Sequence, residues 1–278
     1  MKRKKITRRK LVRIIKQGDT QSLLAIHEDQ FDWEVLKESP WLKIGYFDEY
    51  SILLEAIIDM GYVFRKEENL KRVMDNQGQT VAHIMAWRGH EFDSKNEKHL
   101  LHLADNKGQT VAHVMARCGY KFDPEKDIDL LLLADSNGWT VAHEMARMRY
   151  KFDPGRHKEI LLLANLEGIT VAHVMAGEGY LFDPNTHGEI CELKDKKGYG
   201  VLECFILSND IAISVGRMDQ DLMKLSLESI QKYMEAAKKL NSIDVDTIGV
   251  YEYLKKLFEI KKKKEELGKA LDSLSLKL

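Results

Sequence analysis

Histidine is the most regularly placed reactive residue of this chain. Four histidines stand 30 residues apart in copies of one sequence pattern, at His83, His113, His143 and His173. An imidazole can bind a metal ion or act as a general acid or base, so such a column could form a metal centre or a catalytic array. The alternative is a structural role that recurs because the surrounding unit recurs. The choice depends on the elements that place the four rings.

The other residues with reactive side chains form no recognisable site. His99 and His102 have helical i, i+3 spacing and lie near His90, but no HExxH pattern or nearby cysteine completes a metal site. The three cysteines lack CxxC spacing, which argues for a reducing compartment and against a disulfide or zinc framework. GxSxG, Walker A and GxGxxG motifs are also missing. We therefore expect no metal, no cofactor and no enzymatic activity.

The composition is that of a globular protein. The 278 residues are 44% hydrophobic and 31% charged, with a formal net charge of −1. No uncharged apolar run approaches the ~20 residues that cross a bilayer. The charged N-terminus is not followed by the apolar core and small-residue cleavage site of a signal peptide. We therefore expect a cytoplasmic protein that makes no use of a membrane.

The histidines belong to a repeat of fixed length. The repeats span 75–104, 105–134, 135–164 and 165–194, and a degenerate fifth begins at Asp195. Each begins with Asp or Asn and has Gly three residues later, the signature of a type I turn. A threonine follows two residues after the glycine in four repeats and can cap a helix start; these are Thr80, Thr110, Thr140 and Thr170. The repeat therefore opens with a turn and a capped helix.

Each repeat is predicted to contain two short antiparallel helices. The first runs roughly from Val81 to Arg88 in the first repeat and ends at Gly89, which suits a left-handed C-cap. An Asp-Pro pair, as at Asp123 and Pro124, predicts a second N-cap and first helical position. Such a pair of helices cannot bury its apolar face alone, so neighbouring repeats must stack. The expected fold is all-α, an α-solenoid of stacked helix-turn-helix repeats.

The repeat resembles the ankyrin repeat, whose first half reads D-x-x-G-x-T-P-L-H-x-A-A-x-x-G-H. Here the pattern is D-x-x-G-x-T-V-A-H-x-M-A-x-x-G-Y, with Asp75, Gly78, Thr80, His83 and their equivalents in matching places. The period is 30 residues rather than 33, and the second half of the repeat matches less well. The resemblance implies that the histidine ring bonds to turn backbone and ties adjacent units together, and that the protein binds partners on a concave face.

Stacking also answers the histidine question on geometric grounds. Helices pack about 8–10 Å apart, so equivalent atoms of four repeats are spread over about 25–30 Å. A zinc ion needs its ligands at about 2.0–2.1 Å, and proton transfer needs heavy atoms within about 2.6–3.2 Å. Equivalent histidines therefore cannot share one ion or form a catalytic pair. We expect the threonines and histidines of this column to be structural.

The flanking sequences predict caps on the stack. The segment 52–64 matches the first helix of the repeat with Glu55 in the histidine position, and Glu203 makes the same exchange after the last full repeat. Two further helices are predicted over 218–240 and 246–271. We therefore divide the chain into residues 1–74 (basic arm and capping repeats), 75–209 (repeat core) and 210–278 (helical extension).

Candidate binding residues are those that vary inside the fixed pattern. They occupy the position between Gly and Thr and the positions just before the closing Gly, which the resemblance places on the concave face. Tryptophan, tyrosine and arginine at exposed positions dominate protein interfaces, although a tryptophan here could instead pad a neighbouring repeat. The candidates are Gln79, Trp87, Arg88, Gln109, Arg117, Trp139, Arg147, Ile169 and Tyr199. The expected function is a non-catalytic scaffold for an unidentified protein partner.

The alternative hypothesis is a nucleic-acid-associated protein. Residues 1–16 carry nine Lys or Arg and no acid, which could neutralise several phosphates. The segment has no aromatic residue for base stacking, and Leu11, Ile14 and Ile15 indicate that part of it is a packed helix. A third possibility, self-assembly through the C-terminal helices, is disfavoured because Lys261 to Glu266 interrupt a clean heptad pattern.

Overall fold

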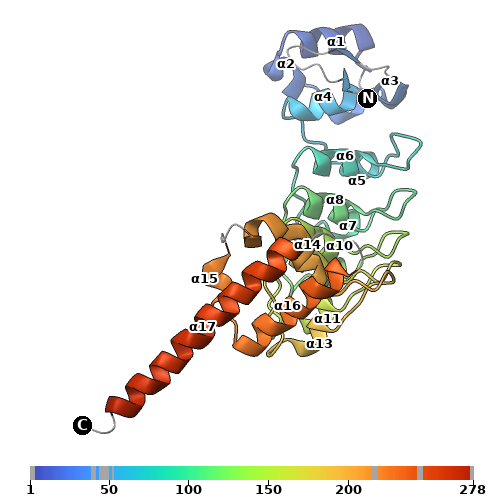
Figure 1. Cartoon of the computed structure of the whole chain (residues 1–278). Coiled ribbons are helices and arrows are strands. Elements are labelled where there is room, and N and C mark those ends of the chain that lie inside the picture. Colours follow the sequence, from blue (N-terminus) through green and yellow to red (C-terminus); the bar gives the residue numbers. More distant parts are fainter. Residues whose placement is uncertain are drawn as a thin grey trace. The chain divides into compact units, whose positions relative to one another are not determined.

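The protein has an all-α fold in the computed structural model, which describes residues 4–38, 42–43, 50–51, 53–214, 218–242 and 247–275 (Figure 1). The only strands among these residues are β1 (Leu42–Lys43) and β2 (Tyr50–Ser51), which pair antiparallel. The chain forms two compact units, Met1–Ser136 and Asn137–Leu278. The boundary falls at the turn that opens the third repeat, and the three-part division made from the sequence stays a prediction.

The first unit contains an N-terminal group of short helices and two full repeats. Its N-terminal elements are α1 (Arg8–Lys16), α2 (Thr20–Leu24), η1 (Glu28–Gln30) and α3 (Trp33–Glu38). The elements of the repeats and the preceding cap are α4 (Leu53–Asp59), α5 (Glu67–Leu70), α6 (Val81–Trp87), α7 (Lys98–Leu101), α8 (Val111–Arg117) and α9 (Ile128–Leu131). Helix α6 contacts both α4 and α8, so successive first helices lie side by side (Figure 1).

The opening turn of a repeat forms because the side chain of an aspartate, or of Asn165 in the fourth repeat, accepts from two backbone N–H groups. The Asp75 Oδ1 atom accepts from the N–H groups of Gln77 and Gln79 at 3.0 and 2.8 Å. The N–H of Gly78 donates to the Asp75 carbonyl at 3.4 Å, which closes the four-residue turn. Gly78 has a φ of +82°, a conformation that favours glycine. The predicted turn is therefore present.

Successive turns bond to one another through their backbones. The Asn106 N–H donates to the Gln77 carbonyl at 2.8 Å, and the Ser136 N–H donates to the Lys107 carbonyl at 2.9 Å. This ladder brings each turn very close to the next. A Cβ atom on Gly108 would lie 3.0 Å from the Ser136 nitrogen, so glycine is needed there for space as well as for its positive φ.

The second helix of each repeat is shorter than the sequence suggested. Asp123 does not cap a helix; its Oδ1 accepts from the Glu125 N–H at 2.9 Å in a local turn. The four-residue helix α9 begins only at Ile128. The reason is local competition, because a short Asp side chain bonds its own following backbone and so stabilises a turn instead of a first helical turn. The Asp-Pro prediction of an N-cap is corrected accordingly.

The core of the repeats is built from the same positions in every copy. The alanine and valine positions of α6 and α8 are buried, as are Met85 and Met115. The Phe of the segment between the two helices is also buried, at Phe64, Phe92 and Phe122. In the second repeat of this unit Tyr120 packs edge-on against Phe122, with ring centroids 4.7 Å apart. Each repeat thus contributes an equivalent set of apolar side chains to its neighbours.

The second unit contains the remaining repeats and the C-terminal extension. Its repeat helices are α10 (Val141–Arg147), α11 (Lys158–Leu161), α12 (Val171–Gly177), α13 (Gly188–Cys191) and the longer α14 (Val201–Ser214). The extension consists of α15 (Asp219–Leu222), α16 (Leu227–Asn241) and α17 (Ile248–Ser275). The helix predicted over 218–240 is thus interrupted, because Ser226 caps a new helix by accepting from the Ser229 N–H at 3.0 Å.

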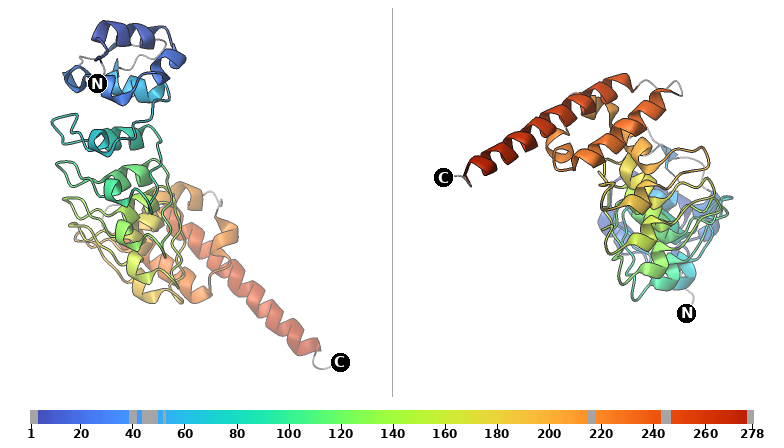
Figure 2. Two further views of the ribbon diagram at one scale, coloured as in Figure 1. Left: turned by 180° about the vertical axis from the view of Figure 1, so that it is seen from behind. Right: turned by 60° about the horizontal axis from the view of Figure 1, so that its bottom comes forward.

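The extension packs on the last repeats. Helix α16 contacts α14 and α17, and α17 also contacts α14. Tyr233 is buried, and its hydroxyl donates to the Phe182 carbonyl at 2.8 Å. Helix α17 continues past these contacts as a long single helix (Figure 2). In the described part of the chain, no helix combines the length and the apolar character needed to span a membrane.

Candidate functional site

The histidine of the repeat links its own helix cap to the next repeat. The Thr80 N–H donates to His83 Nδ1 at 3.2 Å, and the Thr80 hydroxyl lies 2.8 Å from the same nitrogen. Because Nδ1 accepts a backbone N–H, the ring proton is on Nε2, which donates to the Gln109 carbonyl at 3.1 Å. The imidazole therefore uses both nitrogens in neutral form.

The same geometry recurs in the second unit. His143 Nε2 bonds the Ile169 carbonyl at 3.1 Å, and His173 Nε2 bonds the Tyr199 carbonyl at 3.2 Å. The paired threonines Thr140 and Thr170 also accept from the backbone N–H of their histidine at 3.3 Å. In the first unit His113 is fully buried, and its Nδ1 accepts from the Thr110 N–H at 3.1 Å.

Burial sets the protonation of these rings. It lowers the pKa of His83 and of His173 below the ordinary value of 6.5, because a charged imidazolium would lose its hydration in the interior. Among the described residues no group of His, Cys, Asp or Glu side chains is arranged to hold a metal ion. His99 and His102 each lie near a different carboxylate, with Nε2 3.5 Å from Glu67 and 3.9 Å from Asp129.

Where glutamate replaces the repeat histidine, it pairs with a cation. Glu55 on α4 lies 2.5 Å from the Arg88 guanidinium. Glu203 on α14 accepts from the Lys239 ammonium on α16 at 2.7 Å, and the same ammonium donates to the Gly198 carbonyl at 3.2 Å. A carboxylate has no proton to donate to a following turn. At the last repeat, a lysine of the extension thus pairs with the residue in the histidine position.

Three predicted binding residues of the first unit meet at its surface. Trp87 ends α6 and is 42% exposed. The Arg117 guanidinium lies over its ring, 5.5 Å from the ring centroid, and donates to the Gln109 side-chain oxygen at 3.3 Å. We call Trp87, Gln109 and Arg117 the Trp87 surface. Gln109 connects this surface to the hydrogen bonds between repeats. Its backbone carbonyl accepts from His83, and its side-chain oxygen accepts from Arg117.

Two other predicted residues of this unit are placed differently. Arg88 is exposed but engaged by acids, with its guanidinium 2.5 Å from Glu55 and 3.3 Å from Asp59. Gln79 is half-buried, and its backbone completes the opening turn by donating to Asp75. The ion pairs make Arg88 part of the contact between repeats.

The predicted residues of the second unit are Trp139, Arg147, Ile169 and Tyr199. Trp139 is half-buried and packs on the His143 ring, with centroids 4.8 Å apart and ring planes at 35°. This contact lies within the repeat of Trp139 and gives its ring a packing role there. Arg147 is exposed, and its guanidinium lies 3.8 Å from the buried Glu144 carboxylate. The half-buried Ile169 and Tyr199 present their carbonyls to the histidines of the preceding repeats.

The sequence analysis did not identify the structural role of the position between Gly and Thr, which was predicted only as a binding position. The residue between Gly and Thr varies in side chain, yet its carbonyl is the acceptor for the histidine 26 residues earlier. A backbone acceptor leaves the side chain free to change, so variation at this column carried no sign of the contact. The constant spacing between histidine and acceptor was the available signal.

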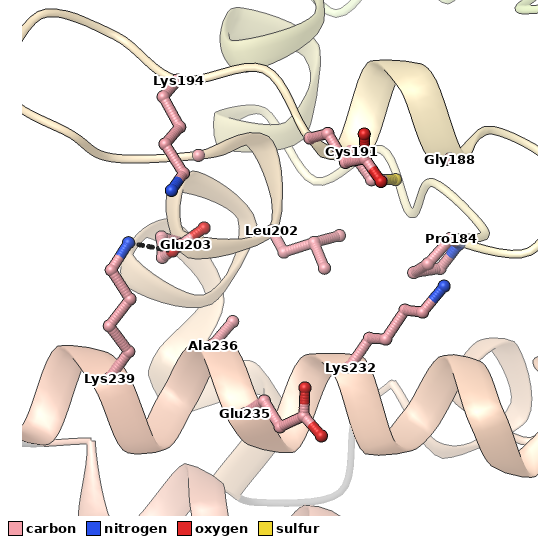
Figure 3. A pocket seen from close by; sticks show the side chains of 12 residues that line it. Pro184, Gly188, Cys191, Lys194, Leu202, Glu203, Lys232, Glu235, Ala236 and Lys239 are labelled. Atoms are coloured by element: carbon pink, nitrogen blue, oxygen red, sulfur yellow. Dashed lines mark hydrogen bonds and ion pairs between the residues drawn. The ribbon is translucent and has the colours of Figure 1, made fainter.

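A cleft of about 510 Å³ lies between the last repeat and α16 (Figure 3). Sequence reasoning did not identify it because Lys232, Glu235 and Lys239 come from the extension. Its walls carry both charges, and the Lys239–Glu203 pair occupies one end (Figure 3). Burial raises the pKa of the Cys191 thiol in this wall to about 12, so it is protonated near neutral pH.

The basic N-terminus forms a packed helix with a cationic outer face. Helix α1 buries Leu11, Ile14 and Ile15, as its sequence indicated. Thr7 caps it by accepting from the Lys10 N–H at 3.4 Å. Its exposed side chains include those of Arg8, Arg9, Lys10, Arg13 and Lys16.

A scan of the chain against protein-family models finds no match, and a search of curated protein sequences finds no relative.

Proposed function

We propose that the chain is an ankyrin-like α-solenoid that acts in the cytoplasm as a non-catalytic scaffold and binds a partner protein along one face of its repeats. The observation that carries this proposal is the Trp87 surface. An exposed tryptophan with an arginine stacked on its ring offers apolar area, a cation and directional donors at one place. These are the side-chain types on which protein interfaces depend most.

The Trp87 surface is also held in place before any partner arrives. Arg117 is fixed by the Trp87 ring and by Gln109, and Gln109 is fixed by His83. An arginine that is already ordered loses less conformational entropy on binding than one that is free. Gln79, Arg88, Trp139, Arg147, Ile169 and Tyr199 are proposed as further partner contacts, Arg88 and Trp139 in addition to the contacts that they make within the protein.

The test is capture of partners from extract of the native cells by the full chain and two variants. Trp87→Ala and Arg117→Glu should each remove the same captured protein, because each deletes a contact of the Trp87 surface. Both side chains lie outside the buried core, so the melting temperature should change by only about 1–4 °C.

The matched control is Lys121→Glu, an equal charge change at an exposed position after α8. This variant should capture the partner as the unchanged chain does. The proposal fails if Trp87→Ala and Arg117→Glu retain the partner, or if both variants unfold and so identify the two residues as structural.

Helix α1 supports the alternative function of nucleic-acid association. Its cations share an exposed face while its apolar residues are buried, so the charge is displayed on a rigid element. This charge would neutralise phosphates without base contacts. Nucleic-acid association remains the second hypothesis.

A further inference from the structure

Helix α17 leaves the body of the second unit halfway along its length. Val250, Leu254 and Leu257 are buried where α17 packs on α14 and α16. Every residue from 262 to 271 is exposed. The distal part of the helix extends beyond the packed part of the unit, with its side chains exposed (Figures 1 and 2).

Three large aliphatic side chains form one stripe, with one of them just before the distal part and two within it. Ile260, Leu267 and Leu271 are 59%, 64% and 64% exposed. At 3.6 residues per turn they lie within about 40° of one another around the helix. Their separations of seven and four residues place Ile260 and Leu267 at d and Leu271 at a of a heptad, with Lys264 at the intervening a position. The run Lys261 to Glu266, which disfavoured a heptad in the sequence, lies within the continuous helix.

The charges around this stripe are segregated. Lys256 and Lys263 border it on one side and Lys264 on the other, all within about 60° of Ile260. The carboxylates Glu259, Glu265 and Glu266 lie about 100° or more away from Ile260. The stripe is therefore a narrow apolar seam bordered by ammonium groups on both sides.

We infer that this seam, formed by Ile260, Leu267 and Leu271 with Lys256, Lys263 and Lys264, is a docking site for an acidic amphipathic helix of a partner protein. The width of the seam favours a helix over a lipid surface, because helices that lie in membranes use a much wider apolar face. Its borders disfavour a second copy of α17, because either orientation of the two helices would place lysine beside lysine.

The inference does not depend on the Trp87 surface, which lies in the other unit. The test uses the full chain and two synthetic three-heptad peptides with leucine at the a and d positions. One peptide has glutamate at the flanking e and g positions, and the other has lysine there. Fluorescence anisotropy at about 0.15 M salt should show binding of the glutamate peptide and none of the lysine peptide.

Variants of the seam should then remove or reverse this binding. Leu267→Ser with Leu271→Ser should weaken the glutamate peptide about tenfold or more, since burying two aliphatic side chains contributes more than 1.4 kcal/mol. Lys262→Ser with Lys269→Ser, on the opposite side of the helix, is the matched control and should weaken it less than about threefold. Lys256→Glu with Lys263→Glu should reverse the preference in favour of the lysine peptide.

Four outcomes would overturn the inference. The first is that neither peptide binds, and the second is equal binding by the seam and control variants. The third is tighter binding of vesicles of phosphatidylserine and phosphatidylcholine than of the glutamate peptide, which would make the seam a lipid contact. The fourth is a concentration-dependent dimer in sedimentation equilibrium that the Leu267→Ser, Leu271→Ser variant abolishes, which would assign the seam to a second copy.

Discussion

At the scale of single residues, the repeat histidine is held neutral by its surroundings. Its Nδ1 accepts from the threonine of its own cap, and its Nε2 donates to a carbonyl of the next repeat. A proton on Nδ1 would turn that acceptor into a donor facing another donor. Burial and acceptance at Nδ1 both favour the uncharged form, whereas the bond from Nε2 to the next repeat raises the pKa; burial is the larger effect and lowers the pKa of His83 and His173.

The lowered pKa values of these two histidines predict that the protein loses stability in mild acid. A folded-state pKa below the ordinary 6.5 means that only the unfolded chain gains the proton as pH falls below 6.5. The stabilisation is therefore complete above pH 6.5 and is lost as pH falls toward the lower folded-state pKa. The free energy of unfolding should fall by at most about 1.4 kcal/mol per pH unit for each histidine.

Urea unfolding between pH 7.5 and 5 measures this dependence. His83→Gln with His173→Gln should lower stability at pH 7.5 and flatten the fall in acid, since glutamine does not titrate. Parallel pH profiles for the two proteins would show that other groups cause the acid loss.

At the scale of elements, the opening turns decide how closely repeats approach. The Lys196 N–H donates to the Glu167 carbonyl at 2.9 Å, and a Cβ on Gly168 would lie 3.1 Å from the Lys196 nitrogen. Gly198, in the turn of the last repeat, has a similar positive φ of +85° but no atom within 4 Å of such a Cβ. Comparison of the two glycines therefore distinguishes the effect of a positive φ from the effect of close packing.

Alanine substitutions at these two glycines should therefore differ in cost. Gly198→Ala should lower the free energy of unfolding by about 1 kcal/mol, because only the positive φ disfavours alanine there. Gly168→Ala has the same backbone strain and must also push apart two hydrogen-bonded turns. We therefore expect it to lower the free energy of unfolding by about 1–2 kcal/mol more than Gly198→Ala does. Chemical denaturation of both variants measures this difference. Equal losses in the free energy of unfolding would show that the bonded turns can move apart without destabilising the protein.

At the scale of the molecule, the segments before and after the four full repeats have glutamate instead of the repeat histidine. Glu55 and Glu203 stand where interior repeats have histidine, and each receives a cation from an adjoining element. Lys239 comes from the extension and bonds both the Glu203 carboxylate and the carbonyl of Gly198 in the last turn. The extension thus supplies polar partners to the last repeat in addition to apolar cover.

Removal of this lysine should destabilise the protein. Lys239→Met leaves the Glu203 carboxylate, which is 10% exposed, without its cation. We expect the free energy of unfolding to fall by about 1–2 kcal/mol, moderated by the partial exposure of the lysine. Lys238→Met, at an exposed neighbouring position, should cost less than about 0.5 kcal/mol. In a double-mutant cycle the loss should shrink when Glu203 is first changed to Gln; an undiminished loss would contradict the coupling.

Much of the local structure followed from residue types alone. The turn at Asp75, the helix from Val81 and the left-handed Gly89 were predictable because each depends on neighbours within a few residues. The short second helix was not, because the Asp123 side chain had two local partners available and bonded its own turn. Nor was the interruption before Ser226, where the cap that starts α16 had no strong pattern ahead of it.

For the candidate site, residue types and spacing alone showed which positions vary between repeats and that the four histidines cannot converge on one centre. A fixed period dictates equal environments and equal spacing. The packing of the folded chain was needed to show that Arg117 stacks on Trp87 while Arg88 pairs with Glu55, and that α17 carries its apolar stripe away from the core. Those outcomes depend on residues about 30 positions apart and on where a helix runs out of neighbours, which local physical chemistry does not specify.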